Sequence, residues 1–246
     1  MTTIIGYGEM ARAIIEGLGR DGVQVVGRDG KKLEDIKNRY GVDVKELKDY
    51  DIEDKTVILA VKPHALEDVA KEIRGRAKTL ISILAGINIK ELKVIDAQNY
   101  VRAMPNIAAA KKASMTALTG DIQAKEEAEE IFNKIGQTLW LESEEKLDIA
   151  TAIAGSGPAF LALVAEAFAD GGVACGLKRD EAYQITEGLF KSYAAIADNT
   201  PSLIKDRVMS PAGTTAAGYG VLERNGVRSA FIEAVAEAFK RACRKS

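Results

Sequence analysis

The N-terminal part of the chain alternates short β-branched runs with amphipathic stretches, and this pattern restricts the fold more than any other feature. Strands are predicted at residues 2–5, 23–26, 56–61, 80–84 and 100–104, with two further candidates at 115–118 and 137–141. Helices are predicted between them, for example at 31–40, 65–74 and 124–135. Strands that alternate with helices form βαβ units, and therefore a parallel sheet with helices on its faces.

After about residue 143 the pattern changes, and no strand is predicted. Helices are predicted at 147–153, 158–175, 179–197, 201–208, 212–223 and 227–244, with apolar positions at a period near 3.6. We therefore predict an α/β domain of residues 1–143 followed directly by an all-α domain of residues 144–246. The helical part is rich in Ala and Gly and apolar on more than one face, which favours a core completed by a second copy. The alternative is an ordinary helical subdomain packed on its own sheet.

The charge balance and the cysteines limit the classes of partner. The chain carries 34 Lys and Arg against 36 Asp and Glu, interspersed to a net charge of −2, which disfavours nucleic acid and anionic membranes as partners. Cys175 and Cys243 lack metal-ligand spacing, so we expect buried or idle thiols in a reducing compartment and no metal site. Because the N-terminus shows no signal peptide, we expect a cytoplasmic protein.

The most apolar run spans residues 149–165 and is interrupted by the sequence Gly-Ser-Gly-Pro at positions 155–158. A membrane-spanning helix needs about 18 or more apolar residues with few interruptions. We therefore expect a buried helix pair in this part of the chain rather than a membrane span.

A glycine turn follows the first predicted strand and opens the first predicted helix. Its residues are Gly6, Tyr7, Gly8, Glu9, Met10 and Ala11, in the pattern G-x-G-x-x-A. Gly6 permits the tight turn, Gly8 lets a pyrophosphate approach the backbone, and Ala11 keeps the helix close to the strand. The free N–H groups of a helix N-terminus attract phosphate. In this context the motif predicts a dinucleotide-binding site, and the alternative is a turn that only packs.

The end of the second predicted strand bears on which dinucleotide binds. Dinucleotide sites specific for NAD have an acidic residue there, bonded to the ribose 2′-hydroxyl, whereas this chain has Arg28. A guanidinium suits a 2′-phosphate, and Lys31 and Lys32 add positive charge, so we favour NADPH over NADH. Asp29 could instead turn inward and bond the ribose, and Arg28 could be a solvated surface charge.

Three more strand exits are expected to line the same crevice, because ligands of open α/β sheets bind at the carboxyl ends of the strands. They are Ala60-Val61-Lys62-Pro63, Ala85-Gly86 and Met104-Pro105-Asn106. His64 is the single histidine, and we expect it to shape the cofactor loop rather than act as a general acid. Tyr7 could stack on the cofactor or face solvent.

Two loops of small residues in the helical part could hold an anion on helix N-terminal N–H groups. They are Gly155-Ser156-Gly157-Pro158 and Ser210-Pro211-Ala212-Gly213-Thr214-Thr215. The alternative is ordinary helix capping, a frequent role of Ser and Thr.

These motifs, in this order, resemble the pyrroline-5-carboxylate reductase family over nearly the whole chain. The most specific is Ser210–Thr215, with Val221-Leu222-Glu223 and Arg228 after it. The resemblance implies reduction of 1-pyrroline-5-carboxylate to L-proline with NAD(P)H, the last step of proline synthesis. It also implies a Rossmann domain followed by an all-helical domain that interlocks in a homodimer, and some members form rings of dimers.

The resemblance also assigns roles to residues. Cofactor contacts fall on the turn from Gly6 to Ala11 and on Arg28, Ala60, Val61, Lys62, Pro63 and Ala85. Substrate contacts fall on Glu144, Gly213, Thr214 and Thr215. Thr215 would bond the ring nitrogen as the catalytic residue, and the site would combine the nucleotide domain of one chain with the helical loop of another.

Some positions depart from the family pattern. Ala212 replaces a frequent Gly, which changes little if its φ is negative; Ile107-Ala108 replaces Thr-Pro; and Arg207 replaces Asn near the cofactor. The rival enzymes are a related NADPH-dependent imine reductase and a β-hydroxyacid-type dehydrogenase, but the latter needs a lysine that residues 158–175 lack. A nucleotide sensor without catalysis and a purely structural helical dimer are the remaining alternatives.

Overall fold

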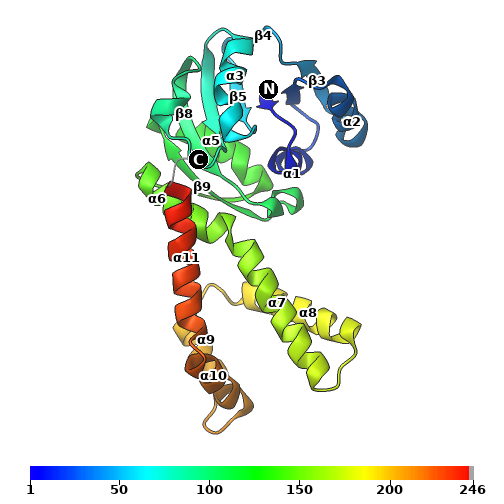
Figure 1. Ribbon diagram of the computed structural model, residues 1–246, viewed down its shortest axis with the longest axis vertical. Coiled ribbons are helices and arrows are strands. Elements are labelled where there is room, and N and C mark those ends of the chain that lie inside the picture. Colours follow the sequence, from blue (N-terminus) through cyan, green and yellow to red (C-terminus); the bar gives the residue numbers. More distant parts are fainter. Residues whose placement is uncertain (244–246) are drawn as a thin grey trace. The chain divides into compact units, whose positions relative to one another are not determined.

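The computed structural model describes residues 1–243 and consists of two compact units (Figure 1). The first unit comprises Met1–Gly155 together with the end of the last helix from Ala238, and the second comprises Ser156–Glu237. The contact boundary therefore falls at Gly155, whereas the sequence predicts a domain boundary at residue 143.

The first unit is built on an eight-stranded sheet in the order β10-β9-β8-β7-β5-β1-β2-β3. The strands are β1 (Thr2–Ile5), β2 (Val23–Gly27), β3 (Asp43–Glu46), β5 (Thr56–Leu59), β7 (Ala77–Ser82), β8 (Ala97–Met104), β9 (Ser114–Gly120) and β10 (Gly136–Trp140). All neighbours pair in parallel except β8 and β9, which are antiparallel. The predicted strands are all present, and the α/β class is confirmed.

Three short strands were not predicted. The edge strand β3 has the sequence Asp-Val-Lys-Glu, in which three charged residues hide the strand pattern, and β4 (Tyr50–Asp51) pairs with β6 (Ile73–Arg74) in a separate two-stranded sheet.

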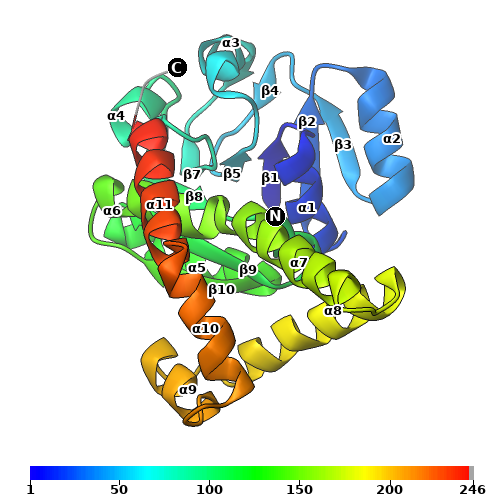
Figure 2. The same ribbon diagram turned by 60° about the horizontal axis from the view of Figure 1, so that its bottom comes forward.

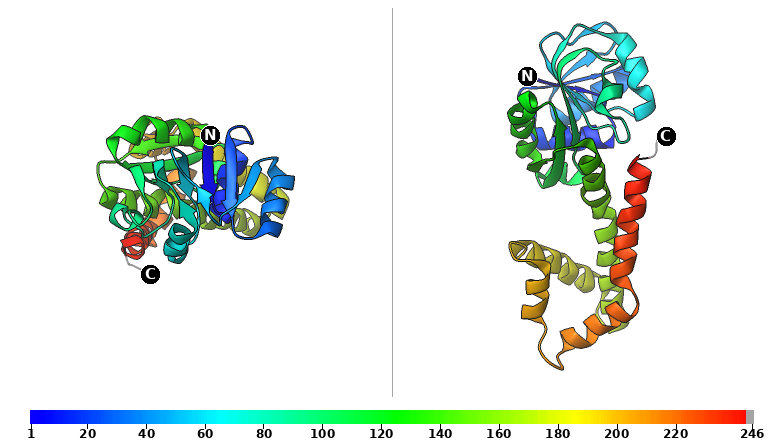
Figure 3. Two further views of the ribbon diagram at one scale, coloured as in Figure 1. Left: turned by 90° about the horizontal axis from the view of Figure 1, so that it is seen from above. Right: turned by 90° about the vertical axis from the view of Figure 1, so that its left-hand side faces the viewer.

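Helices cover both faces of the large sheet (Figure 3). They are α1 (Glu9–Leu18), α2 (Gly30–Tyr40), α3 (Leu66–Glu72), α4 (Ile89–Leu92) and α5 (Lys125–Phe132). Because side chains alternate along a strand, Ile4 lies in the core cluster with α1 and α5, while its neighbour Ile5 lies in the cluster with α3 and α4. Strands buried on both faces explain the unbroken apolar runs in the sequence.

The order of strands determines where a ligand can bind. From β1 the chain builds outward through β2 and β3, then returns to the other side of β1 with β5 and continues to β7 and β8. The direction of winding thus reverses between β1 and β5. Such a reversal opens a crevice at the carboxyl ends of the strands, where the glycine turn after Ile5 and the loop after Leu59 lie.

The first unit also contains α6 (Glu144–Ala150) and a π-helical turn, Thr151–Gly155. Leu147 is fully buried and packs with Met104 and Ala117 of the sheet. This apolar anchor explains why the contact boundary follows α6 instead of preceding it.

The second unit is helical, with α7 (Gly157–Ala174), α8 (Arg179–Ala195), α9 (Pro201–Val208), α10 (Thr214–Arg224) and most of α11 (Val227–Cys243). Helices α7 and α8 pack against each other (Figure 2). In α7 only Ala169 is buried, and Leu163 is 65% exposed. The expected all-α region is confirmed, but its apolar residues have few partners within this chain.

The expectation of a buried helix pair over residues 149–165 is wrong for the single chain. Glu144–Ala174 forms one continuous helical stretch. Only 11% of its most apolar 18-residue window is buried. The π-helical turn accommodates Gly155 without breaking the helix. By length and composition alone, this stretch is the one among the described residues that could cross a membrane, a test that the core helix of a soluble protein also passes.

Candidate functional site

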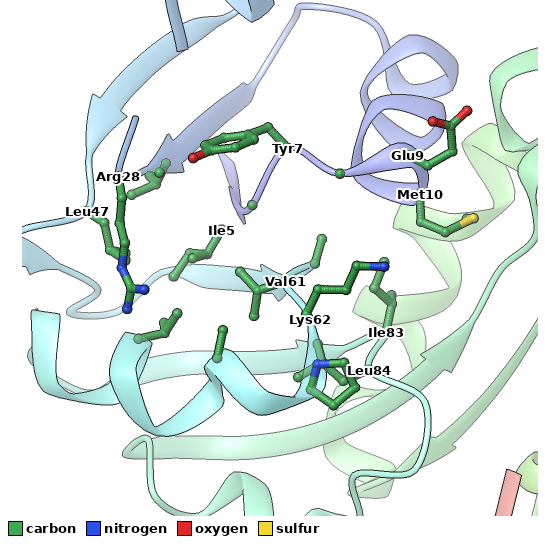
Figure 4. Close-up of a pocket in the computed structure, with 18 of the residues that line it drawn as sticks. Ile5, Tyr7, Glu9, Met10, Arg28, Leu47, Val61, Lys62, Ile83 and Leu84 are labelled. Atoms are coloured by element: carbon green, nitrogen blue, oxygen red, sulfur yellow. The ribbon is translucent and has the colours of Figure 1, made fainter. Parts of the chain in front are cut away.

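A cavity of about 780 Å³ lies at the carboxyl ends of β1, β2, β5 and β7 (Figure 4). Its size is within the range of cofactor and small-molecule sites. It brings together, from the predicted set, Gly6, Tyr7, Gly8, Glu9, Met10, Arg28, Ala60, Val61, Lys62, Pro63 and Ala85. The cavity is elongated: Arg28 and Leu47 lie at one end, and Met10 and Ile83 at the other (Figure 4).

The two glycines of the turn are required for different reasons. Gly6 has φ +118°, and a Cβ there would lie 2.4 Å from the carbonyl oxygen of Ala60. Gly8 has an ordinary φ of −69° and is the N-cap of α1, and a Cβ there would meet nothing within 4 Å. Gly6 therefore serves the close approach of β1 to β5, whereas Gly8 keeps open the space in front of the α1 N-terminus.

That open space fits the pyrophosphate of a dinucleotide. Gly8 provides no capping side chain, so the first N–H groups of α1 are left for an anion. Ala11 does not line the cavity: it is fully buried in the core, and its small side chain lets α1 pack closely on the sheet.

Tyr7 packs against the end of β2. A Cβ on Gly27 would lie 2.2 Å from Cε1 of Tyr7, so the phenol ring rests on the Gly27 backbone. Lys32 Nζ lies 5.8 Å from the ring centroid, and Arg12 Nε donates to the Tyr7 carbonyl oxygen at 3.1 Å. The ring is thus half-buried and forms one wall of the cavity.

Arg28 is paired in this structure. Its Nε lies 2.8 Å from Glu72 Oε1, and its Nη1 lies 3.9 Å from Asp68 Oδ2, both on α3. The Arg28 side chain is 42% exposed. The guanidinium lines the cavity, but carboxylates already occupy part of its hydrogen-bonding capacity.

Asp29, the alternative ribose ligand, caps α2. Its Oδ1 accepts hydrogen bonds from the backbone N–H of Lys31 at 3.0 Å and of Lys32 at 3.2 Å. These bonds, that of Lys32 foremost, lower the pKa of the Asp29 carboxyl below its ordinary value. Asp29 thus has a local structural role that explains its position in the sequence.

The cavity is also lined by residues that were not predicted from the sequence to contact the cofactor. They are Ile5, Arg12, Val26, Gly27, Leu47, Ala65, Val69, Ile83 and Leu84. Most are apolar and carry no chemical signal, and Leu47 follows the unpredicted strand β3. The basic Lys32 lines the cavity as expected from its charge, whereas the exposed His64 does not line it.

A buried arginine connects the sheet to α6. Arg102, on β8, is 2% exposed; its Nη1 lies 3.1 Å from Glu144 Oε1 and its Nη2 lies 2.8 Å from Asp148 Oδ1. Its buried Nε has no hydrogen-bond partner among the described residues. Glu144 also accepts from the backbone N–H of Ile89 at 2.9 Å. Glu144, expected to contact substrate, therefore has its Oε1 held by both an ion pair and a backbone hydrogen bond.

Asn106 stabilises the neighbouring loop. Its side chain accepts from the backbone N–H of Ala108 and donates to the carbonyl of Ala154, both at 3.0 Å. Ile107, one of the departures from the family pattern, is 59% exposed.

The predicted substrate loop lies on the second unit, at the N-terminus of α10. Gly213 is the N-cap and provides no capping side chain, so the N–H groups of Thr214 and Thr215 face outward from the first turn. Gly213 N donates to Ser210 O at 3.0 Å, and a Cβ on Gly213 would lie 2.4 Å from Ser210 Oγ. A side chain at position 213 would therefore displace the Ser210 hydroxyl.

The structure answers two questions that the sequence left open about the helical loops, namely the sign of φ at Ala212 and whether residues 155–158 begin a helix. Ala212 has φ +58°, so the residue is in the left-handed region that glycine adopts at lower cost. Gly155-Ser156-Gly157-Pro158 lies within the continuous helical stretch from Glu144 to Ala174, so it does not present a free helix N-terminus to an anion. Both results arise from backbone geometry that residue type alone does not determine.

Glu223 and Arg228, which follow the Ser210–Thr215 loop in the family motif, form a small polar network with Tyr219. Arg228 donates to the Glu223 carboxylate and, at 2.6 Å, to the Tyr219 hydroxyl. Hydrogen bonds to the Glu223 carboxylate, that from Arg228 foremost and that from Tyr219 second, lower the pKa of Glu223 to about 2. The network links α10 to α11 next to the Gly226 turn. Arg207 is exposed on α9.

The two cysteines are free and exposed, so of the two alternatives, buried or idle thiols, burial is wrong for the single chain. Among residues 1–243, no group of three or more His, Cys, Asp or Glu side chains is arranged to hold a metal ion.

Two models of known protein families match this chain, one in its helical part and one in its α/β part. Residues 144–245 match the family model described as pyrroline-5-carboxylate reductase dimerisation, and residues 2–86 match that described as NADP oxidoreductase, coenzyme F420-dependent.

Full-length relatives carry the same name. The chain is 36% identical over 255 residues to pyrroline-5-carboxylate reductase of Synechocystis sp., covering 97% of this chain and 95% of the relative. It is 34% identical over 250 residues to the Helicobacter pylori (strain J99) enzyme, covering 96% of each. The solved structure of 1-pyrroline-5-carboxylate reductase from Streptococcus pyogenes matches with a TM-score of 0.85 and 30% identity, covering 98% of this chain and 97% of that one. The chain therefore belongs to the pyrroline-5-carboxylate reductase family.

Proposed function

We propose that this protein reduces 1-pyrroline-5-carboxylate to L-proline by hydride transfer from NADPH or NADH. The observation that carries the proposal is the full-length match to enzymes of that name, together with a cavity built on the glycine turn. The reaction would be the last step of proline biosynthesis and would take place in the cytoplasm.

The cofactor would lie along the elongated cavity. The N–H groups at the start of α1 would bind the pyrophosphate, with Gly8 leaving it room. Arg28 and Leu47 would bind the adenosine end, while Met10, Ile83 and Ala85 would line the nicotinamide end. When bound, NADPH supplies the hydride.

The substrate carboxylate would bind at the N-terminus of α10. Gly213, Thr214 and Thr215 offer backbone N–H groups there without a capping side chain, and such a terminus favours an anion. The Thr215 hydroxyl would hydrogen-bond the ring nitrogen, and Glu144 would complete the substrate contacts.

The chemistry needs orientation more than acid catalysis. Hydride addition to the imine carbon of a protonated cyclic imine, C2 of the pyrroline ring, which becomes C5 of proline, gives a neutral ring amine directly. The substrate can arrive with that proton, so the protein has to align the ring with the cofactor. Alignment of this kind contributes up to roughly 7–11 kcal/mol in well-oriented reactions.

The active enzyme would be a homodimer. Within one chain, large apolar residues of the helical unit are exposed; Leu161, Leu163 and Phe168 of α7 are 53%, 65% and 52% exposed. The family model that matches this region is described by its dimerisation. A second copy that covers these residues would supply the missing core.

The rival enzyme classes are less well supported. A β-hydroxyacid-type dehydrogenase needs a lysine on the long helix, and α7 contains none. A nucleotide sensor would not need the tight Ser210–Gly213 turn that presents Thr214 and Thr215.

The test is a turnover assay with 1-pyrroline-5-carboxylate and either NADPH or NADH, with L-proline identified as the product. A panel of other cyclic imines and β-hydroxyacids is run in parallel. The proposal is contradicted if neither cofactor supports proline formation, and turnover of another imine alone would favour the related imine reductase.

A further inference from the structure

Arg28 is the cationic residue expected to choose between the two dinucleotides, and it has two acidic neighbours. Glu72 Oε1 is 2.8 Å from Arg28 Nε, and Asp68 Oδ2 is 3.9 Å from Arg28 Nη1. Both acids lie on α3, one turn apart, so their carboxylates reach the same guanidinium. Glu72 is the better placed of the two, because its side chain is 33% exposed whereas that of Asp68 is 60% exposed.

The competing acids affect the two cofactors differently. A 2′-phosphate carries a charge near −2 at neutral pH and needs the Arg28 donors. To use them it must displace Glu72 or bind beside it, and either arrangement brings like charges together. A 2′-hydroxyl carries no charge; it leaves the Arg28–Glu72 pair intact and can donate to the Glu72 carboxylate.

Lys71 Nζ lies 3.9 Å from Asp68 Oδ1 and offsets part of the Asp68 charge, but Glu72 keeps its own pair with Arg28, so the competition remains. The Asp29 carboxylate is engaged by the backbone N–H groups of Lys31 and Lys32, so it caps α2 rather than pairing with Arg28. The Lys32 ammonium group is 3.7 Å from Asp29 Oδ2 and lies over the Tyr7 ring. Arg28 and the α3 acids therefore form a distinct charge cluster at the adenosine end of the cavity.

We infer that Glu72, assisted by Asp68, is a specificity-determining residue that lowers the preference for NADPH and lets the enzyme use NADH as well. The inference rests on the proposed function, because it assumes that the cavity binds a nicotinamide dinucleotide. It goes further by naming the residue whose charge sets the ratio of the two affinities.

Direct binding measurements test the inference without requiring turnover. The Kd values of NADPH and NADH are measured by fluorescence for the wild-type protein, Glu72→Gln and the control Glu67→Gln. Glu67 lies on the same helix and is exposed, and its substitution makes the same charge change without touching Arg28. Melting temperatures confirm that all three proteins are folded, and Asp68→Asn serves as a second variant.

We expect Glu72→Gln to bind NADPH roughly three- to tenfold more tightly, as removing one like charge at this separation in a wet site would give. Its Kd for NADH should be unchanged or weaker. Asp68→Asn should shift the ratio in the same direction but less, Glu67→Gln should not shift it, and the Glu72 effect should shrink at high salt. The same change should appear with 2′,5′-ADP and not with 5′-AMP.

The outcomes separate this inference from the proposed function. If the wild-type protein binds both dinucleotides but Glu72→Gln leaves the ratio of their Kd values unchanged, or shifts it no more than Glu67→Gln, Glu72 does not set specificity. If the wild-type protein binds neither dinucleotide, the proposed function fails first, and this inference fails with it.

Discussion

Gly6 and Ala60 are in such close contact that a Cβ on Gly6 would lie 2.4 Å from the Ala60 carbonyl oxygen. The two residues follow β1 and β5, whose final residues Ile5 and Leu59 are paired in register. The close approach therefore joins two segments of the cavity at the point where the sheet reverses its winding. Gly8, two residues along, has no such neighbour.

This difference predicts that one of two matched substitutions affects the stability of the fold and the other affects cofactor binding. Gly6→Ala should destabilise the fold, because it adds a backbone clash at a φ of +118°; we expect a loss of about 2–4 kcal/mol. Gly8→Ala should keep the wild-type melting temperature but weaken dinucleotide binding, because its methyl group points into open space. Denaturant unfolding and fluorescence titration measure the two effects. A Gly8→Ala protein with unchanged cofactor affinity would contradict the pyrophosphate assignment.

Arg102 should contribute far more to stability than a surface arginine. Replacing Arg102 by Met leaves Glu144 and Asp148 without their buried partner, and removing one member of a buried pair costs about 3–5 kcal/mol. Arg76→Met is the control, because its pair with Asp96 is 56% and 70% exposed and such pairs contribute about 0–1 kcal/mol. Equal losses of unfolding free energy in the two variants would show that the network around Arg102 is not a structural anchor.

Glu127 should make stability depend on pH in acid. It accepts from Thr56 Oγ1 at 2.6 Å, Thr79 Oγ1 at 2.7 Å and Lys78 Nζ at 3.0 Å, at the ends of the strands opposite the cavity. Burial alone would raise its pKa, but these hydrogen bonds outweigh it and lower the pKa below the ordinary 4.5. A depressed carboxyl pKa stabilises the fold above the unfolded pKa, and the stabilisation is lost as pH falls through the folded pKa.

Glu127→Gln should therefore cost about 1–2 kcal/mol at pH 7, and the difference from wild type should narrow below about pH 4.5. Glu126→Gln removes a neighbouring, exposed carboxylate in the same helical turn and is the control. Unfolding free energies measured from pH 3 to pH 7 test this. A difference that stays constant over the whole range would contradict the role of the ionised carboxylate.

Thr215 should matter for turnover and not for the cofactor. With its hydroxyl bonded to the ring nitrogen, Thr215→Ala should lower kcat/KM by about 100-fold, as is typical when an active-site hydrogen-bond donor is lost. The Kd for NADPH should stay within about twofold, and Thr215→Ser should recover most of the activity because it keeps the hydroxyl. Parallel losses of kcat/KM and cofactor affinity would remove Thr215 from the substrate site.

Much of the fold could be predicted because the strands are buried on both faces. Runs such as Val57–Leu59 are apolar without interruption, so their type is clear in the sequence. The edge strand β3 was missed, since Asp43, Lys45 and Glu46 face solvent and only Val44 packs inward. Local chemistry is thus enough for the interior of the sheet but not for its edge.

The candidate site was predictable where it depends on short-range geometry and not where distant residues meet. The turn at Gly6 and Gly8 follows from spacing within a few residues. The Arg28–Glu72 pair joins two residues that are far apart in the sequence, and the Arg102 network joins β8 to α6. The positive φ of Ala212 depends on the turn around it. These features arise from tertiary packing, which residue type and periodicity do not specify.

The central claim is that a hydride from the dinucleotide bound on the glycine turn reaches the imine carbon of a pyrroline ring, which becomes C5 of proline. The most direct measurement is mass spectrometry and NMR of the product formed from 1-pyrroline-5-carboxylate and NADPH carrying deuterium at both C4 positions of the nicotinamide. The account predicts L-proline with one deuterium, bound to C5. L-Proline without deuterium, or no L-proline with either cofactor, would contradict it.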